Sequence, residues 1–159
     1  MKYVGIFCFA VSATFLVSQS SPPREQVGPL SDGFLLNSGW KLKPAGRQIP
    51  LDTFPMSTAL SKDGKYLLVL NGGQNPPSIS VIVNGTMEEK ARVPVPDGWL
   101  GLAFSPDGKN VYVGGGSRAS VYEFAFADGK LERKRTFPIV AEKNRQPADF
   151  IGDVAVSPD

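Results

Sequence analysis

The chain has 159 residues, 42% of them hydrophobic and 20% charged, which is enough for one globular domain with a sizeable core. Its net charge of +2 and scattered Lys and Arg exclude the basic stripe of a nucleic-acid binder. It contains no His, which excludes a Ser-His-Asp or Cys-His catalytic site. Its 17 Gly and 14 Pro indicate many turns and short elements, which favours an all-β fold.

Residues 1–20 have the pattern of an export signal. Lys2 precedes an apolar run from Val4 to Val17, and small residues follow up to Ser20. We predict a signal peptide cleaved near Ser20, a linker over residues 21–32, and a protein located in the periplasm or outside the cell. The alternative is that the segment stays as an N-terminal anchor, although the run is short for a membrane helix. We expect no stable membrane span after the signal is removed.

A repeated turn is the main signal of the remaining sequence. The motif Ser-x-Asp-Gly-Lys occurs at residues 61–65 and 105–109, which are 44 residues apart, and each copy lies between two apolar runs. A third copy begins at Ser157, 52 residues further on, after a polar insert at residues 141–149. Asp-Gly between apolar runs is a strong hairpin signal, and repeats of this length are typical of propeller blades.

Each repeat continues through a second hairpin. The segment 78–83 passes through Asn84-Gly85 into a polar segment, and the segment 120–127 does the same through Asp128-Gly129. The spacing therefore predicts four-stranded antiparallel blades with polar outer strands.

The first strand of each repeat carries small residues on one face and larger residues on the other. A strand with small residues on one face and bulky residues on the other is expected where sheets stack face to face. The bulky face of one sheet then packs on the small face of the next. The small positions are Ser57, Ala59, Gly101, Ala103, Asp153 and Ala155, and the opposite positions are Thr58, Leu60, Leu102, Phe104, Val154 and Val156.

Together these patterns predict an incomplete β-propeller with two full blades and the start of a third. The blades are expected at residues 56–96 and 98–140, and the third begins at residues 149–159. Residues 33–51 are strand-like but lack the turn motif, so we expect them to supply outer strands that close the final blade. The chain is therefore expected to be part of a longer protein.

The "SPDGK" turn and the apolar strand after it resemble the YVTN-type, or YncE-like, β-propeller family. Residues 68–71 and 112–115 occupy the place of Tyr-Val-Thr-Asn, although both copies depart from that motif. The stretches "KPAGRQIPL", "VLNGGQNPPSISVI" and "VPDGWLGLAFSPDGKNVYVGGG" are similar to the N-terminal propeller of exported bacterial proteins that also carry a phosphoesterase domain of the alkaline-phosphatase superfamily.

This resemblance implies a binding or scaffold platform whose partner is a ligand or the downstream domain, with any phosphoesterase activity located outside this chain. The alternative is a lactonase-like seven-bladed hydrolase, since "SVYEFAFADGKLE" resembles a strand and turn of that family. The resemblance carries over no catalytic residue from either family. We predict no cofactor and no metal site, because the Asp-Gly turns lie a whole blade apart and are better explained as structural.

Two residues are candidates for ligand binding. Trp99 lies just before a first strand, where it either stacks on a ligand at the rim or packs in the core. Asp153 places a carboxylate where the other repeats have Ser57 and Gly101, so it either points at the central channel or accepts a hydrogen bond from nearby backbone.

Overall fold

A computed structural model describes residues 26–158, so the predicted signal peptide and its cleavage point lie outside the described residues. The chain divides after Gly46 into two compact units. Strands dominate both units, and the single helical element among the described residues is the short 3₁₀ turn η1 (Glu142–Asn144). The predicted all-β class is confirmed, with three antiparallel sheets.

The first unit is a small sheet in the order β1-β2-β3. Its strands are β1 (Gly28–Leu30), β2 (Gly33–Leu35) and β3 (Lys41–Leu42), and Leu35 is its buried apolar residue. β1 lies within residues 21–32, which were assigned to a linker, so regular structure begins before the predicted boundary at Gly33. β2 and β3 lie in the range predicted to supply closing strands, and within the described residues they pair inside this sheet.

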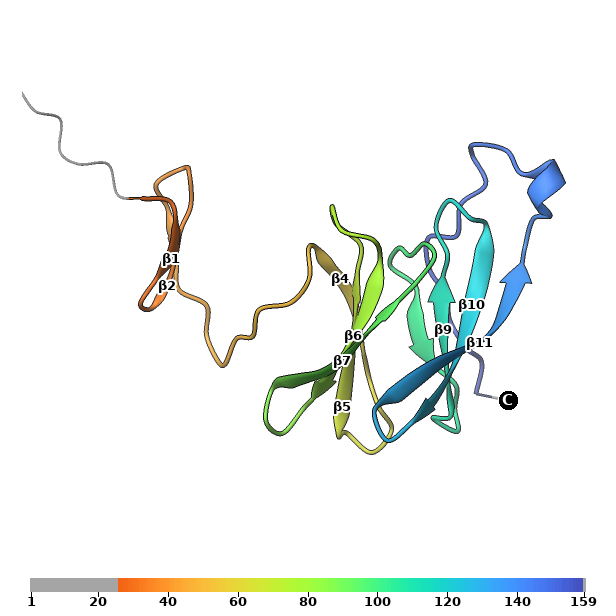
Figure 1. Cartoon of the computed structure of the whole chain (residues 1–159), viewed down its shortest axis with the longest axis horizontal. Coiled ribbons are helices and arrows are strands. Elements are labelled where there is room, and N and C mark those ends of the chain that lie inside the picture. The colour runs from red at the N-terminus through yellow and green to blue at the C-terminus, as the bar shows by residue number, and fades with distance from the viewer. Residues whose placement is uncertain (1–25, 159) are drawn as a thin grey trace, which may run out of the picture. The chain divides into compact units, whose positions relative to one another are not determined.

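The second unit contains two four-stranded antiparallel sheets, each a meander in chain order (Figure 1). The first sheet has the strands β4 (Pro55–Leu60), β5 (Tyr66–Asn71), β6 (Ser78–Val83) and β7 (Glu88–Pro94). The second sheet has the strands β8 (Leu102–Phe104), β9 (Asn110–Gly114), β10 (Ser120–Ala127) and β11 (Lys130–Pro138). The two predicted four-stranded repeats are thus present.

The repeated turns connect the first and second strand of each sheet. Asp63 Oδ1 accepts hydrogen bonds from Ser61 Oγ at 2.7 Å and from the Lys65 N–H at 3.1 Å. The second turn repeats these contacts at Ser105 and Asp107. A short side chain that bonds its own backbone two residues later stabilises a turn, which explains both aspartates without a ligand.

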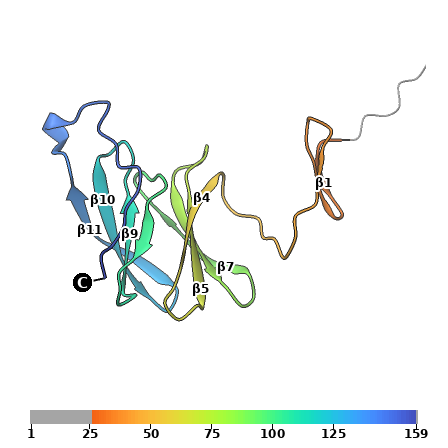
Figure 2. The ribbon, with the colours of Figure 1, turned by 180° about the vertical axis from the view of Figure 1, so that it is seen from behind.

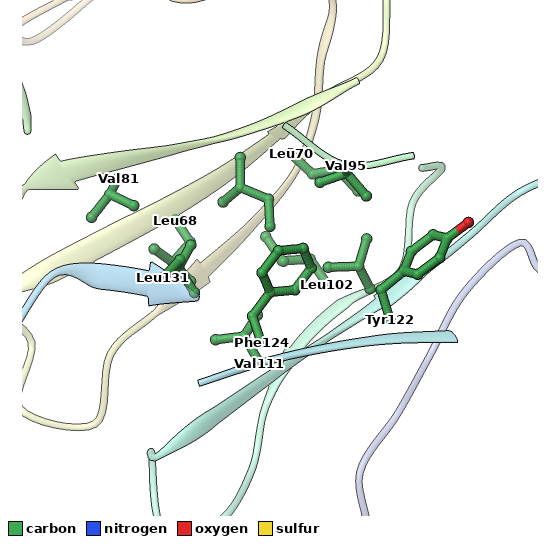
Figure 3. Close-up of a cluster of buried hydrophobic side chains, with 11 residues drawn as sticks. Leu68, Leu70, Val81, Val95, Leu102, Val111, Tyr122, Phe124 and Leu131 are labelled. Atoms are coloured by element: carbon green, nitrogen blue, oxygen red, sulfur yellow. The ribbon is translucent and has the colours of Figure 1, made fainter. Parts of the chain in front are cut away.

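The two sheets of the second unit stack, and the faces that meet form one apolar core (Figure 3). Phe124 of β10 is fully buried in this core, where it lies among side chains of both sheets. On its margin the rings of Phe104 and Phe126 meet edge to face with centroids 5.1 Å apart. The other buried members are Leu68, Leu70, Ile79, Val81, Val95, Leu102, Val111, Val113, Tyr122 and Leu131.

The packing of the first strands follows the predicted asymmetry. β4 and β8 are neighbours, and Leu102 and Phe104 of β8 belong to the core on which the small Ala59 of β4 also packs. The bulky face of the second sheet therefore meets the small face of the first. The bulky residue Leu60 lies on the other face of β4 and is 53% exposed.

Residues 149–158 do not form the predicted inner strand of a third blade. Ile151 makes an isolated antiparallel bridge with Gly116, and residues 152–158 contain no strand. A strand needs a paired neighbour along its length, and among the described residues the bridge at Ile151 is the one strand pairing of this segment. The segment nevertheless lies along β8, since a Cβ on Gly101 would be 2.8 Å from the Val154 backbone nitrogen.

A buried carboxylate with two exposed cationic partners lies on the face of the second sheet that points away from the core. The Glu123 side chain is 1% exposed and accepts a 2.6 Å hydrogen bond from Arg135 Nε, with Lys134 Nζ at 3.4 Å. The hydrogen bond from Arg135 holds the pKa of Glu123 below its ordinary value of 4.5, although burial acts in the opposite direction.

We expect this carboxylate to make stability depend on acid pH. A pKa that is lower in the folded than in the unfolded state stabilises the fold above the unfolded pKa, and the contribution is lost as pH falls through the folded pKa. The free energy of unfolding, measured with urea between pH 7 and pH 3, should therefore fall more steeply below about pH 4.5 for the unmodified chain than for the Glu123→Gln variant. Parallel curves for the two proteins would contradict the assignment.

Candidate functional site

All the longer connections of the two stacked sheets lie at one end, which we call the loop end (Figures 1 and 2). It comprises residues 52–54, 72–77, 95–101, 115–119 and 139–152. The opposite end carries only tight turns, at residues 61–65, 84–87, 105–109 and 128–129. Binding residues are commonly found on loops that a rigid scaffold positions, so the loop end is the candidate site.

An aspartate ahead of the first strand ties the loops of each sheet together. Asp97 accepts hydrogen bonds from its neighbouring Gly98 N–H at 2.8 Å and from Ser117 Oγ at 2.6 Å. Asp52 makes the corresponding link in the first sheet, where it accepts from Asn75 Nδ2 at 2.6 Å and from Ser78 Oγ at 3.2 Å. Each aspartate thus fixes the loop between the second and third strands against the start of the first strand.

The hydrogen bonds to Asp52 lower the pKa of its carboxylate. The bond from Asn75 contributes most to lowering its pKa, followed by the bond from the Thr53 N–H. Arg92 lies 3.3 Å from the same carboxylate. The tether in the first sheet is therefore charge-assisted at neutral pH.

An exposed aromatic residue follows this aspartate in every copy of the repeat. Phe54, Trp99 and Phe150 are 64%, 41% and 48% exposed, and each lies just ahead of the position where a first strand begins or is expected. Trp99 and Phe150 meet edge to face with ring centroids 5.7 Å apart. Of the two placements expected for Trp99, the rim and the core, the structure shows the rim.

Asp153 lies on the segment that covers β8 and is exposed. Its Oδ1 accepts a hydrogen bond of 2.8 Å from the Val154 N–H, which matches the backbone-bonding alternative. Together with Tyr112 and Val121 it lines an open cavity of about 520 Å³ on the outer face of the second sheet. Phe150, the partner of Trp99, precedes Asp153 by three residues in the chain.

A cluster around Tyr122 was missed by sequence reasoning. Tyr122 is 4% exposed, and its hydroxyl points away from the other labelled core side chains (Figure 3). Burial raises the pKa of Tyr122 and the charge of Asp97 adds to this, whereas Arg118, Arg133 and Arg145 oppose it. The Arg133 guanidinium also lies over the ring, 6.0 Å from its centroid.

The other two aromatic residues of the rim could have been found from the sequence. Each repeat has an aspartate one or two residues ahead of an aromatic residue, at Asp52, Asp97 and Asp149, which is the signal for Phe54 and Phe150 beside Trp99. No comparable pattern indicates Arg118 or Arg145, because they come from loops of different length.

The comparisons with known proteins find no protein-family model and no curated protein that matches this chain. Among residues 26–158, no helix is long and apolar enough to cross a bilayer. In the same part of the chain, no group of three or more acidic, His or Cys side chains is placed to hold a metal ion. The loop end presents the aromatic side chains of Phe54, Trp99 and Phe150 and the arginines Arg118 and Arg145, which suit stacking and charge recognition.

Proposed function

We propose that the two stacked sheets are consecutive blades of an exported β-propeller of the YVTN type, which acts as a binding platform through its loop end. We also propose that it forms the N-terminal part of a protein that carries a phosphoesterase domain. The platform holds a ligand or that downstream domain.

The observation that carries the proposal is the packing of one repeat on the next. Two four-stranded meanders arise from units 44 residues apart, their first strands are neighbours, and the bulky face of the second meets the small face of the first. The outer face of the first sheet presents the bulky Leu60, and the outer face of the second sheet presents the small Gly101. A stack with complementary outer faces can continue by the same contacts, as in a propeller.

The segment ahead of β4 supports the same architecture. Residues 47–52 run along the outer face of the first sheet, since Arg47 donates to the Gly85 and Thr86 carbonyl oxygens and Asp52 contacts Ser78. A segment in that position suits the outer strand of a preceding blade, which is the role expected for residues 33–51.

The coding sequence beyond Asp159 tests the architecture. We expect further Ser-x-Asp-Gly-Lys repeats followed by a domain with Asp, Ser or Thr, and His metal motifs. A stop codon without further repeats would refute the fusion and the closed ring. Export is tested separately by mass spectrometry of the mature protein, which should begin close to residue 21.

We expect Trp99→Ala to change stability little, and the intact Trp99 to report on access to the loop end. Trp99 is 41% exposed and its aromatic contact is with Phe150, so the free energy of unfolding should fall by no more than about 1 kcal/mol. In a Trp40→Phe background Trp99 is the one remaining tryptophan, and acrylamide quenching of its fluorescence reports access to the loop end. Quenching should be weaker in the full-length protein than in the 159-residue chain if the downstream domain is the partner.

A further inference from the structure

The loop end of the second sheet contains a buried hydrogen-bond donor that has no acceptor. The Nε atom of Arg145 is buried and without a hydrogen-bond partner, and Arg145 as a whole is half-buried. Nearly all buried polar groups of native proteins have a partner, so an unpaired guanidinium N–H calls for one. An ionised donor left unpaired is more costly than a neutral one.

The backbone ties both ends of the segment that contains Arg145 to the loop that carries Arg118. The segment that contains Arg145 leaves this loop at Ile139, whose N–H donates to the Ala119 carbonyl at 2.9 Å. It returns at Ile151, whose N–H donates to the Gly116 carbonyl at 3.0 Å. Arg118 and Arg145 therefore belong to two connections of the same loop end, residues 115–119 and 139–152.

The carboxylates of these loops do not neutralise the two arginines. Asp97 accepts hydrogen bonds from Gly98 and Ser117, and Asp149 accepts one of 2.8 Å from the Gln146 N–H. Within residues 26–158 neither Arg118 nor Arg145 forms an ion pair. Two guanidinium groups therefore remain available, one of them with a buried N–H.

We propose that Arg145 and Arg118 bind the oxyanion of a small molecule, a carboxylate or a phosphate group, at the loop end of the second sheet. The planar guanidinium presents paired N–H donors that match two oxygens of either group. The aromatic rim of Trp99 and Phe150 belongs to the same loop end, where it suits an apolar part of the ligand. This inference rests on the proposed function, in which the loop end is the binding site, and it adds the chemical class of the ligand.

Titration of the 159-residue chain with inorganic phosphate, and separately with acetate, tests this site at constant ionic strength. The readouts are the ¹H–¹⁵N resonances of the arginine Nε–H groups and the melting temperature. We expect a saturable shift of the Arg145 Nε–H resonance and a rise in melting temperature with at least one of the two anions. The stronger anion identifies the oxyanion class.

Variants localise the binding. Arg145→Gln and Arg118→Gln should each weaken anion binding about tenfold or more, as expected for loss of a charge-assisted contact. The affinity of Arg145→Lys should lie between that of Arg145→Gln and that of the unmodified chain. Lys109→Gln, at the opposite end of the sheets, is the matched control and should bind as before. Circular dichroism spectra identical to that of the unmodified chain establish that each variant is folded.

Two results would overturn the inference: no saturable response to either anion, or a response that Arg145→Gln and Arg118→Gln leave unchanged. Failure of the proposed function is a different result. It would appear as absence of further repeats in the coding sequence, while phosphate or acetate binding would still depend on the two arginines.

Discussion

Phe124→Ala should lower the free energy of unfolding by about 4 kcal/mol, the cost of removing a fully buried phenyl ring and leaving a cavity. The effect is large because Phe124 lies between the two sheets, where its ring touches the core side chains of both. Loss of the ring weakens the one large apolar interface of the second unit. Urea unfolding followed by circular dichroism measures the change.

Phe54→Ala is the matched control for this experiment. The Phe54 side chain is 64% exposed at the loop end, and its backbone already has a positive φ of 53°, which the substitution leaves in place. Its cost should stay within about 0.5 kcal/mol, as for most surface substitutions. Equal losses from Phe54→Ala and Phe124→Ala would mean that the core does not lie between the two sheets.

Gly101→Val should displace the segment that lies on β8. A Cβ at position 101 would approach the Val154 nitrogen to 2.8 Å and the Asp153 carbonyl carbon to 3.0 Å. Both are backbone atoms, so the segment must move and cannot relieve the clash by a rotamer change. We expect a loss of about 2 kcal/mol in the free energy of unfolding, typical of overpacking.

Hydrogen exchange reports this displacement directly. The Ile151 N–H donates to the Gly116 carbonyl at 3.0 Å, so its exchange should become much faster in Gly101→Val. Gly152→Val is the matched control, because a Cβ at position 152 meets no atom within 4 Å. Unchanged protection of the Ile151 amide in Gly101→Val would show that residues 152–156 do not rest on β8.

Much of the fold follows from local features of the sequence. Ser61 and Asp63 form their turn through hydrogen bonds within five residues, and the same letters at Ser105 and Asp107 form the same turn. The alternation of small and bulky residues on the first strands predicted two buried faces; the structure buries the face with Leu102 and leaves Leu60 of the first sheet 53% exposed. Such features can be predicted because each depends on neighbours in the chain or on a period of two.

The third repeat shows where this reasoning stops. Residues 153–156 have the pattern of a first strand, yet they form none, because pairing requires a second strand that the described residues do not provide. The aspartate tethers were equally hidden, since the contact of Asp97 with Ser117 spans 20 residues and depends on how two loops meet. For Trp99, only the structure decided between rim and core.

The sequence by itself determined an all-β chain built of repeated four-stranded units, the positions of their tight turns, and the faces on which they pack. The tertiary structure decided which long loops come together, and so brought Tyr122, Arg118 and Arg145 to one end of the second sheet. The physical reason is the range of the interactions. Turn bonds and strand periodicity are local, whereas a side-chain cluster depends on where distant segments return, which no short pattern encodes.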